Sequence, residues 1–315
     1  MHTDTYDAVV VGGSWAGLSA AMQLARARRR VLVVDAGRPR NRFAHSSHGF
    51  LGQDGRAPME ILDTARSQVL AYPTAEFRSD EVIRADPCDA ASHAEDVKNR
   101  TFEIVLASGA VARSRRLVLA TGVVDELPDV PGLRERWGVT VLHCPYCHGY
   151  EVAGGRLGVL AIGEMSVHQA LLLPDWSSDV TFFINGTFEP TDEHRAHLAA
   201  RGVQVESRSV AGVVGDPDAA LDIQLDGPEG REVVRLDALF TGPRTRMASP
   251  LAGQLGCLFD DAPHGPVIQT DATKATTVPG VFAAGDAARA QHNATWASAD
   301  GVMAGMAAHR SLALP

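Results

Sequence analysis

Two cysteines that are separated by two residues offer the clearest chemistry in this sequence. The stretch 144–148 reads Cys-Pro-Tyr-Cys-His. Its spacing lets the two sulfur atoms meet across one turn of the chain, as in a redox pair that alternates between dithiol and disulfide. A helix that begins after Cys144 would stabilise a thiolate in the pair, and His148 can take or hold a proton. The stretch therefore predicts a redox site with Cys144, Cys147 and His148 as its catalytic residues.

Three other interpretations of this stretch each meet an objection. Cys-x-x-Cys-His is also the attachment signature of c-type haem, but that attachment normally needs an exported chain, and no signal peptide is visible. Zinc could bind the two cysteines and the histidines beside them, but adjacent ligands crowd a tetrahedral site and no second cysteine pair is present, so no metal is expected. A chance pair of thiols does not explain the proline between them. The isolated Cys88 and Cys257 are expected to be small buried hydrophobic residues.

A glycine-rich turn near the N-terminus indicates a dinucleotide site. Residues 6–11 are a short apolar run that predicts a buried strand, and an Ala-rich helical pattern follows the turn Gly-Gly-Ser-Trp-Ala-Gly at 12–17. Such a turn aims backbone N–H groups and the helix dipole at a pyrophosphate. A second buried strand ends in Asp35, whose carboxylate can accept hydrogen bonds from a ribose. Ser14 stands where the pattern has its second glycine, and it is small enough for the phosphates to approach.

A second signal selects among the dinucleotides. Asp35 favours a ribose with a free 2′-hydroxyl, as in FAD or NAD. Residues 280–286 read Gly-Val-Phe-Ala-Ala-Gly-Asp before an Ala/Gly-rich helix that is predicted to end near His309. This segment resembles the C-terminal motif of two-domain flavoprotein reductases, which implies that Asp286 binds the ribityl chain and that residues 295–299 lie below the flavin. The helix would then point the positive end of its dipole at the flavin ring.

The elements that must position these residues repeat along the chain. A strand–glycine–helix unit at 6–35 is followed by a second one that begins near residue 156. Two such units, each with later β segments, are typical of an α/β fold with two Rossmann-like three-layer nucleotide-binding domains. The last segment returns to the first module, so the FAD domain is predicted to be discontinuous. The predicted divisions are 1–122 (FAD domain, first part), 123–242 (central domain with the cysteine pair) and 243–315 (FAD domain, second part).

Composition excludes several classes of partner. The chain has 315 residues, which suits two domains of ordinary size, and its 30 glycines suit tight phosphate-binding turns. Its formal charge of −9 argues against nucleic acid and anionic membranes as partners. No stretch reaches the roughly 18 apolar residues that span a bilayer. A cytoplasmic protein is therefore expected, and in that compartment a close cysteine pair is more often catalytic than structural.

Taken together, the motifs resemble the low-molecular-weight thioredoxin reductase family. The resemblance covers nearly the whole chain and runs, in the expected order, through the turn at 12–17, the Ala-Thr-Gly hinge at 120–122, the cysteine pair and the motif that ends in Asp286. It implies a thioredoxin reductase-like fold, FAD as cofactor and a homodimer. The residues that it implies for FAD binding are Gly12, Gly13, Ser14, Ala16, Gly17, Asp35, Ala36, Arg42, Thr121, Gly122, Gly285 and Asp286.

One departure from that family points to a subgroup. Thioredoxin reductases usually have an Asp after the second cysteine, where this chain has His148. The sequence Cys-Pro-Tyr-Cys-His-Gly-Tyr-Glu at 144–151 is instead similar to the dithiol oxidases of gliotoxin, holomycin and romidepsin biosynthesis, as are the segments 12–21 and 47–55. This resemblance implies antibiotic biosynthesis, in which a small-molecule dithiol is oxidised to a disulfide with O2 as electron acceptor and H2O2 as product.

A second departure concerns the central module. The turn at 163–168 reads Gly-Glu-Met-Ser-Val-His, so Glu164 places a negative charge where a pyrophosphate would lie. Residues 185–189 offer no cation for a 2′-phosphate. These features predict that NADPH binding is lost while the fold is kept. The alternatives are an NAD(P)H- or ferredoxin-dependent thioredoxin/disulfide reductase and a non-enzymatic redox sensor. Further candidates for the site, each more often structural when taken singly, are His45, His48 and His292.

Overall fold

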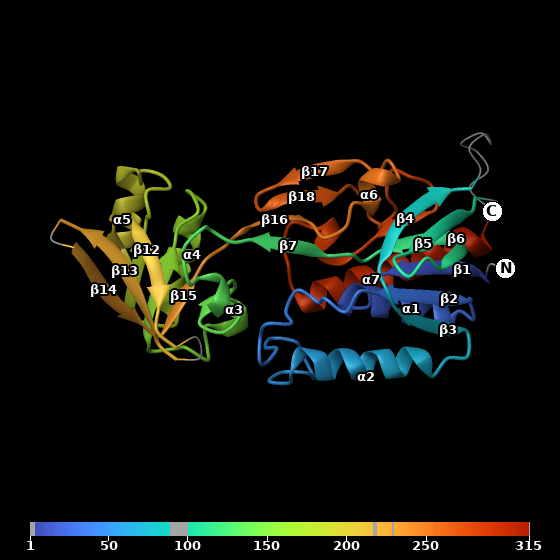
Figure 1. The fold of residues 1–315 in the computed structure, drawn as a ribbon, viewed down its shortest axis with the longest axis horizontal. Coiled ribbons are helices and arrows are strands. Elements are labelled where there is room, and N and C mark those ends of the chain that lie inside the picture. The colour runs from blue at the N-terminus through green and yellow to red at the C-terminus, as the bar shows by residue number, and fades with distance from the viewer. Residues whose placement is uncertain (1–3, 89–99, 217–218, 229, 315) are drawn as a thin grey trace. The chain divides into compact units, whose positions relative to one another are not determined.

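A computed structural model describes residues 4–88, 100–216, 219–228 and 230–314 (Figure 1). The chain divides into two compact units, each with cores of its own. Unit 1 comprises Met1–Arg42, Met59–Val124 and Thr245–Pro315, and unit 2 comprises Phe43–Pro58 and Asp125–Arg244. The sequence-based division had placed residues 43–58 in the FAD domain, whereas the structure packs them with the unit that carries the cysteine pair.

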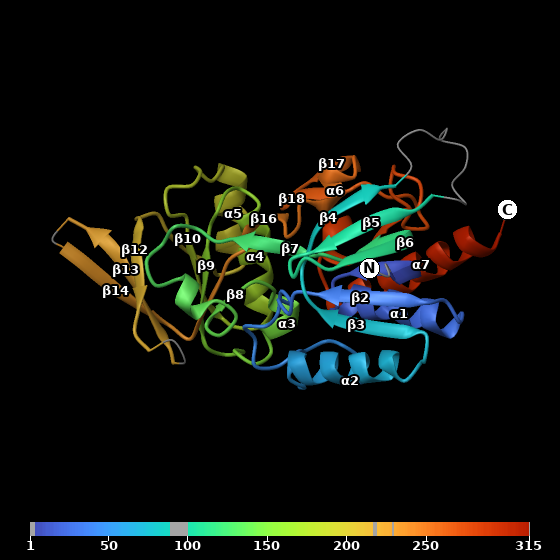
Figure 2. The same cartoon turned by 45° about the vertical axis from the view of Figure 1, so that its right-hand side comes forward.

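Unit 1 is built on parallel strands that are buried on both faces. Its strand order is β3-β2-β1-β6, and β19 pairs with the last part of β6. Figure 2 shows β2 and β3 side by side at one edge of this sheet. Nearly continuous runs of buried Val, Leu and Ala form the two central strands, as is typical of parallel strands that are covered on both sides. The strands are β1 (Asp4–Val11), β2 (Val31–Asp35), β3 (Ala75–Ser79), β6 (Val111–Leu119) and β19 (Val281–Ala283).

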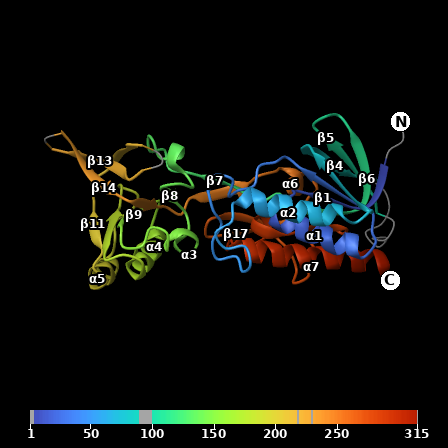
Figure 3. The ribbon, with the colours of Figure 1, turned by 90° about the horizontal axis from the view of Figure 1, so that it is seen from below.

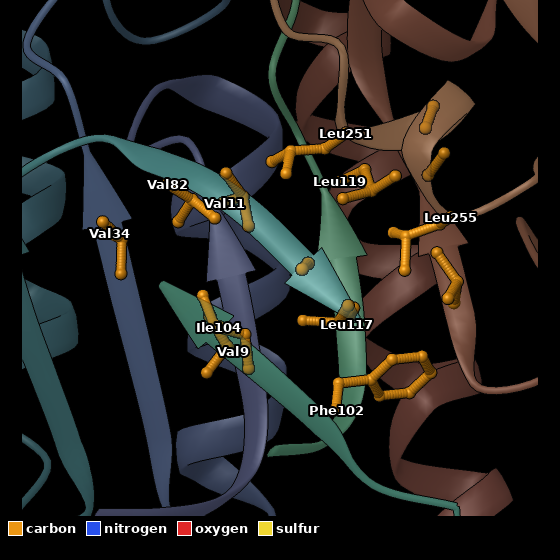
Figure 4. Packing of buried hydrophobic residues seen from close by; sticks show 14 of the residues in the cluster. Val9, Val11, Val34, Val82, Phe102, Ile104, Leu117, Leu119, Leu251 and Leu255 are labelled. Atoms are coloured by element: carbon orange, nitrogen blue, oxygen red, sulfur yellow. The ribbon is translucent and has the colours of Figure 1, made fainter. Parts of the chain in front are cut away.

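Different layers cover the two faces of this sheet. Helices cover one face (Figure 3), and these are α1 (Trp15–Arg26), α2 (Pro58–Leu70) and α7 (Ala294–Ala313). Apolar side chains of an antiparallel meander cover the other face, where Val9 and Val34 share a core with Ile104 and Leu251 (Figure 4). The remaining elements of unit 1 are β4 (Val82–Pro87), β5 (Phe102–Leu106), α6 (Leu251–Gln254), β17 (Phe259–Ala262), β18 (Gly265–Ile268) and η3 (Gly285–Ala288).

Unit 2 repeats this plan. Its parallel sheet has the order β11-β10-β9-β15-β8, with strands β8 (Val141–Leu142), β9 (Arg156–Leu160), β10 (Asp179–Phe183), β11 (Gln204–Glu206) and β15 (Ala238–Phe240). One core packs α4 (Ser166–Leu172), η2 (Leu173–Asp175) and α5 (Asp192–Ala200) against the sheet. Another core packs an antiparallel sheet against it, with strands β12 (Val210–Val214), β13 (Leu221–Gly227) and β14 (Gly230–Leu236).

Four short elements complete the description. The cysteine pair lies at α3 (Pro145–His148), and η1 (Arg134–Arg136) precedes it. The chain passes between the units through β7 (Val123–Glu126) and β16 (Arg244–Met247), which pair with each other. The expected fold class, α/β with two Rossmann-like three-layer units, is confirmed. Within the described ranges, every helix is too short or too polar to cross a membrane.

Helices α1 and α7 approach each other backbone to backbone. A Cβ added at Gly301 would lie 2.0 Å from the carbonyl oxygen of Ala16, and one at Gly305 would lie 2.5 Å from the carbonyl oxygen of Ala20. Any larger residue at either glycine would therefore push the two helices apart. This contact joins the first helix of the chain to the last one.

We expect Gly301→Ala to lower the free energy of unfolding by about 1–3 kcal/mol, because the added methyl group overpacks the contact with Ala16. Gly253→Ala is the matched control, since Gly253 lies in α6 and a Cβ there meets no atom within 4 Å. The control should leave stability unchanged or raise it by up to about 1 kcal/mol through helix propensity. Denaturant unfolding measures both, and equal stability of the two variants would show that the helix contact tolerates a side chain.

Candidate active site

The two sulfur atoms of the cysteine pair lie close together at the edge of the unit 2 sheet. Strand β8 ends at Leu142, and Cys144 is then the N-cap of α3, with Pro145 in the first helical position, where no N–H is required. The Sγ atoms of Cys144 and Cys147 are 2.7 Å apart. Both cysteines are partly buried, and no disulfide joins them. The expected helix start after Cys144 is present, and the geometry allows a disulfide to form with a small change in side-chain torsion.

His148 ends the same short helix and is suited to accept a proton. Partial burial lowers its pKa from the ordinary value of 6.5, because desolvation disfavours the charged imidazolium. The negative charge of Glu151 raises that pKa and the nearby His48 lowers it, and the net direction is downward. His148 is therefore mainly neutral near pH 7, which is the protonation state that a general base requires.

A segment distant in sequence contributes to this group. His48 belongs to residues 43–58, and its Nδ1 lies 3.4 Å from Oε1 of Glu151 and 3.7 Å from Oδ1 of Asp54. The N–H of Gly49 donates to the same Asp54 oxygen at 2.8 Å. Sequence reasoning had named His48 as a candidate but had missed Glu151 and Asp54. The available signal for Glu151 was its position three residues after His148, at the end of the Cys-Pro-Tyr-Cys-His-Gly-Tyr-Glu stretch.

Aromatic side chains border the cysteine pair. Tyr146, which lies between the two cysteines, is 72% exposed, and Tyr150 is 83% exposed. The ring of Tyr146 meets Trp176 edge to face, with centroids 5.6 Å apart. Large rings that remain this exposed offer apolar contact area to a molecule that approaches the thiols.

The glycine turn of unit 1 has the geometry that a dinucleotide requires. Gly12 has a φ of +105°, and a Cβ there would lie 2.2 Å from the carbonyl oxygen of Ala120. The N–H of Gly13 donates to Oδ1 of Asp35 at 2.9 Å, which links the turn to the acid at the end of β2. A Cβ at Gly17 would lie 1.8 Å from the carbonyl oxygen of Gly12. All three glycines are therefore required by the close approach of strand, turn and helix.

The C-terminal motif reaches the same turn. Gly285 packs against Ala16, since an added Cβ would lie 2.9 Å from the Cβ of Ala16. Asp286 accepts a charge-assisted hydrogen bond of 2.9 Å from Nη1 of Arg40. Sequence reasoning had assigned Arg42 to FAD binding and had missed Arg40. Arg42 donates to the carbonyl oxygen of Pro39 at 3.0 Å. No local motif marks Arg40, because its partner is 246 positions away along the chain.

These residues fit FAD as a group. Ser14 is the N-cap of α1, and the first turn of that helix contains no acid, so the helix does not neutralise its own positive end. The carboxylate of Asp35 accepts from Gly13 through Oδ1, and because a carboxylate has several acceptor sites it could also accept from a ribose. Residues from both ends of unit 1 would hold the cofactor, and those near the turn are Gly12, Gly13, Ser14, Ala16, Gly17, Asp35, Ala36, Thr121, Gly122, Gly285 and Asp286.

The corresponding turn of unit 2 is occupied by charge pairs. Oε1 of Glu164, at the start of α4, lies 3.6 Å from Nε2 of His194 on α5. The loop after β10 was expected to lack a cation, but the structure brings Arg195 to it from α5. Arg195 forms an ion pair with Glu189 in that loop. Arg195 is therefore already paired with a carboxylate, and a phosphate that bound it would have to displace Glu189.

The other candidate residues are distributed over both units. Cys257 is buried as predicted, and desolvation raises the pKa of its thiol. The prediction for Cys88 is wrong, because it is exposed just after β4. His45 is exposed within 43–58, and His292 belongs to unit 1, just before the N-cap of α7. Within the described residues, no cluster of three or more His, Cys, Asp or Glu is arranged to hold a metal.

Known proteins match this chain over almost its whole length. Residues 6–303 match the model of the family described as pyridine nucleotide-disulphide oxidoreductase. Thioredoxin reductase tcpT of Claviceps purpurea (strain 20.1) is 34% identical over 312 residues, which cover 97% of this chain and 94% of tcpT. Thioredoxin reductase sirT of Leptosphaeria maculans is 30% identical over 315 residues, which cover 95% of this chain and 92% of sirT.

Solved structures agree with these matches. An oxidoreductase from Agrobacterium tumefaciens superposes with a TM-score of 0.89 at 47% identity and covers 99% of both chains. HlmI superposes with a TM-score of 0.87 at 40% identity, covering 99% of this chain and 94% of HlmI. A putative thioredoxin reductase TrxB from Bacillus anthracis has a TM-score of 0.87 at 25% identity, covering 98% of each chain. The expected thioredoxin reductase-like fold is confirmed.

Mild oxidation of the reduced, folded protein should join Cys144 to Cys147, because their sulfur atoms are already 2.7 Å apart. Non-reducing peptide mapping should find this cross-link, while the buried Cys257 stays unmodified. Cys88→Ser should give the same cross-link, since Cys88 lies outside the pair, and Cys147→Ser should give none. A product in which the pair stays reduced while Cys88 is consumed would contradict the assignment.

Proposed function

Because this chain belongs to the pyridine nucleotide-disulphide oxidoreductase family, we propose that it is an FAD-dependent dithiol oxidase. Its substrate would be a small-molecule dithiol of natural-product biosynthesis, which leaves as an intramolecular disulfide, with O2 as electron acceptor and H2O2 as product. The observation that carries the proposal is the close pair of sulfur atoms beside a histidine whose pKa burial has lowered. Such a site is prepared to take protons and electrons from thiols.

Thiol–disulfide exchange at the cysteine pair accounts for the oxidation of the substrate. His148 takes the proton from one substrate thiol, and the resulting thiolate attacks Sγ of Cys144 in the Cys144–Cys147 disulfide. The Cys147 thiolate leaves, and a mixed disulfide with Cys144 remains. The second substrate thiolate then attacks the substrate sulfur of that bond and releases the Cys144 thiolate with the cyclic disulfide. Two electrons have passed from the substrate to the pair, and two protons have been released.

The turn of unit 1 supports FAD as the resident cofactor. When bound, FAD would accept two electrons from the reduced cysteine pair, so that the disulfide is restored, and would pass them to O2, so that H2O2 is formed. The chain's part would be to hold the cofactor: the positive end of α1 would face the pyrophosphate, and Asp35 would accept from the ribose. Asp286 would accept from the ribityl hydroxyls, in exchange for or in addition to its bond with Arg40.

The charge pairs in unit 2 support a reaction without a nicotinamide cofactor. An anionic pyrophosphate at the turn after β9 would meet the carboxylate of Glu164, which His194 holds there. A 2′-phosphate would have to compete with Glu189 for Arg195. Electrons would then enter only through the cysteine pair.

The rival function follows from the printed names of relatives. Both tcpT and sirT are called thioredoxin reductases, so an NAD(P)H- or ferredoxin-dependent reductase of thioredoxin is the main alternative.

The exposed rings of Tyr146 and Tyr150, which are close to the two cysteines in sequence, are compatible with a small apolar substrate. The resemblance also implies a homodimer, which sedimentation analysis of the purified protein would test.

Anaerobic stopped-flow measurements separate the two functions. A small dithiol should bleach the flavin absorbance of the holoenzyme, whereas NADPH and NADH should leave the flavin oxidised, because Glu164 and Glu189 disfavour their phosphates. Admission of O2 should restore the absorbance and yield about one H2O2 for each disulfide formed, as the electron balance requires. Rapid bleaching by NADPH would instead establish the reductase.

Substitution of the attacked cysteine tests the exchange step. Cys144→Ser should keep its bound FAD and its fold but lose dithiol turnover by at least about 10³-fold, since no disulfide can then form. Cys88→Ser, which alters an exposed thiol outside the pair, should retain full turnover. Oxygen consumption with a dithiol measures both variants, and full activity of Cys144→Ser would remove the pair from the mechanism.

A further inference from the structure

Residues 43–58, called the strap below, are packed into the unit that carries the cysteine pair although their neighbours in sequence belong to unit 1. Phe43 packs against Gly138, where an added Cβ would lie 2.6 Å from the Cβ of Phe43. Ser47 pairs with Arg56 through an antiparallel bridge that includes a 2.8 Å backbone hydrogen bond. The bridge closes the strap into a loop and fixes the backbone beside His48.

His48 is held between two carboxylates. Its Nδ1 lies 3.4 Å from Glu151 and 3.7 Å from Asp54, and Gly49 fixes Asp54 through a 2.8 Å backbone hydrogen bond. The His48 side chain is only 21% exposed, whereas Glu151 is 37% and Asp54 69% exposed. The imidazole is therefore withdrawn from solvent, and the carboxylate of Glu151 is shared between it and His148.

The titratable groups around His148 come from two elements. Its own segment supplies Glu151 and the two thiols, and the strap supplies His48 with its partner Asp54. From the side of η2, the neighbour is the uncharged Trp176, which packs against Gly149 in the same segment. The carboxylate stabilises a proton on His148, and the second imidazole opposes it.

We propose that Glu151 and His48 act as a pair of positioning residues that set the basicity of His148, so that the strap forms part of the catalytic unit. The inference rests on the proposed function, in which His148 deprotonates the substrate thiol. A base must be strong enough to take that proton and yet be unprotonated at the working pH. Glu151 supplies the basicity, because its carboxylate stabilises a proton on His148. His48 limits this effect because it contacts the same carboxylate.

The test is a pair of substitutions with opposite expected signs. Glu151→Gln removes the favourable charge and should move the pKa of His148 further down. His48→Gln removes the opposing imidazole and its contact with Glu151, and should move the pKa of His148 up. NMR titration of the assigned His148 imidazole in the full-length holoenzyme measures both shifts. The acid limb of the pH profile of kcat/KM for a dithiol should move in the same two directions.

The chain supplies a matched control pair. Glu164 and His194 lie 3.6 Å apart in the same unit and form the same type of contact, but neither contributes to the shift of His148. Glu164→Gln and His194→Gln should leave the titration of His148 unchanged. We expect Glu151→Gln to lower kcat/KM several-fold. Glu151→Asp, which keeps the charge, should recover part of the wild-type titration of His148 and part of the lost kcat/KM.

Shifts of the same sign in Glu151→Gln and His48→Gln, or shifts no larger than those of the controls, would overturn the inference. Far-UV circular dichroism of each variant shows that it is folded before it is titrated. The NMR titration does not depend on the electron acceptor. If NADPH reduces the flavin while His148 shifts as expected, the dithiol oxidase fails and the positioning pair stands.

Discussion

Unit 1 depends on the contact in which helices α1 and α7 touch through their backbones. Gly301 and Gly305 permit it, since any Cβ there would strike the carbonyl oxygens of Ala16 and Ala20. The same approach brings Gly285 against Ala16, at the N-terminal end of α1. Residues from the two ends of the chain thus form one turn region, and the 120 residues Asp125–Arg244 are inserted between them. The insertion can change its chemistry without altering that contact.

A comparison of the two units shows that the same fold can carry different charges at its glycine turn. Both have a parallel sheet with a glycine-containing turn after the equivalent strand, β1 in one and β9 in the other. At the first turn no acid lies in the opening turn of α1, and the acid at Asp35 receives the N–H of Gly13. At the second turn Glu164 lies 3.6 Å from His194. The two units share one plan and differ in the charge near the helix N-terminus, and a carboxylate there makes the binding of a phosphate less favourable.

Local patterns in the sequence predicted most of the fold and much of the candidate site. The strand, turn and helix around Gly12 follow one another within a few residues, so periodicity and glycine spacing suffice to place them. The same holds for the helix start after Cys144. The link between Arg40 and Asp286, by contrast, joins positions 246 apart and is set by tertiary packing alone. No periodicity could have revealed it.

The strap was missed for the same reason. Its residues follow the first βαβ unit directly, and nothing in their composition shows that they pack with a unit whose remaining residues begin only at Asp125. His48 was named only as one histidine among several, because its partner Glu151 lies 103 positions away. The exposure of Cys88 was also beyond prediction, since a lone cysteine carries no periodic signal.

The charge state of His148 bears on the direction of the reaction. Reduction of a disulfide consumes two protons, so a reductase gains from an acid beside its cysteines, whereas oxidation of a dithiol releases two protons and gains from a base. Burial lowers the pKa of His148, and the carboxylate of Glu151 only partly offsets that effect. A neutral imidazole next to Cys147 can accept a proton at pH 7 and has little to donate. Under the proposed function, a neutral His148 would therefore suit electron flow from thiols to the cysteine pair. In the same proposal, the carboxylate of Glu164 and the ion pair of Arg195 with Glu189 would disfavour the phosphates of a nicotinamide cofactor, which would drive electrons the other way.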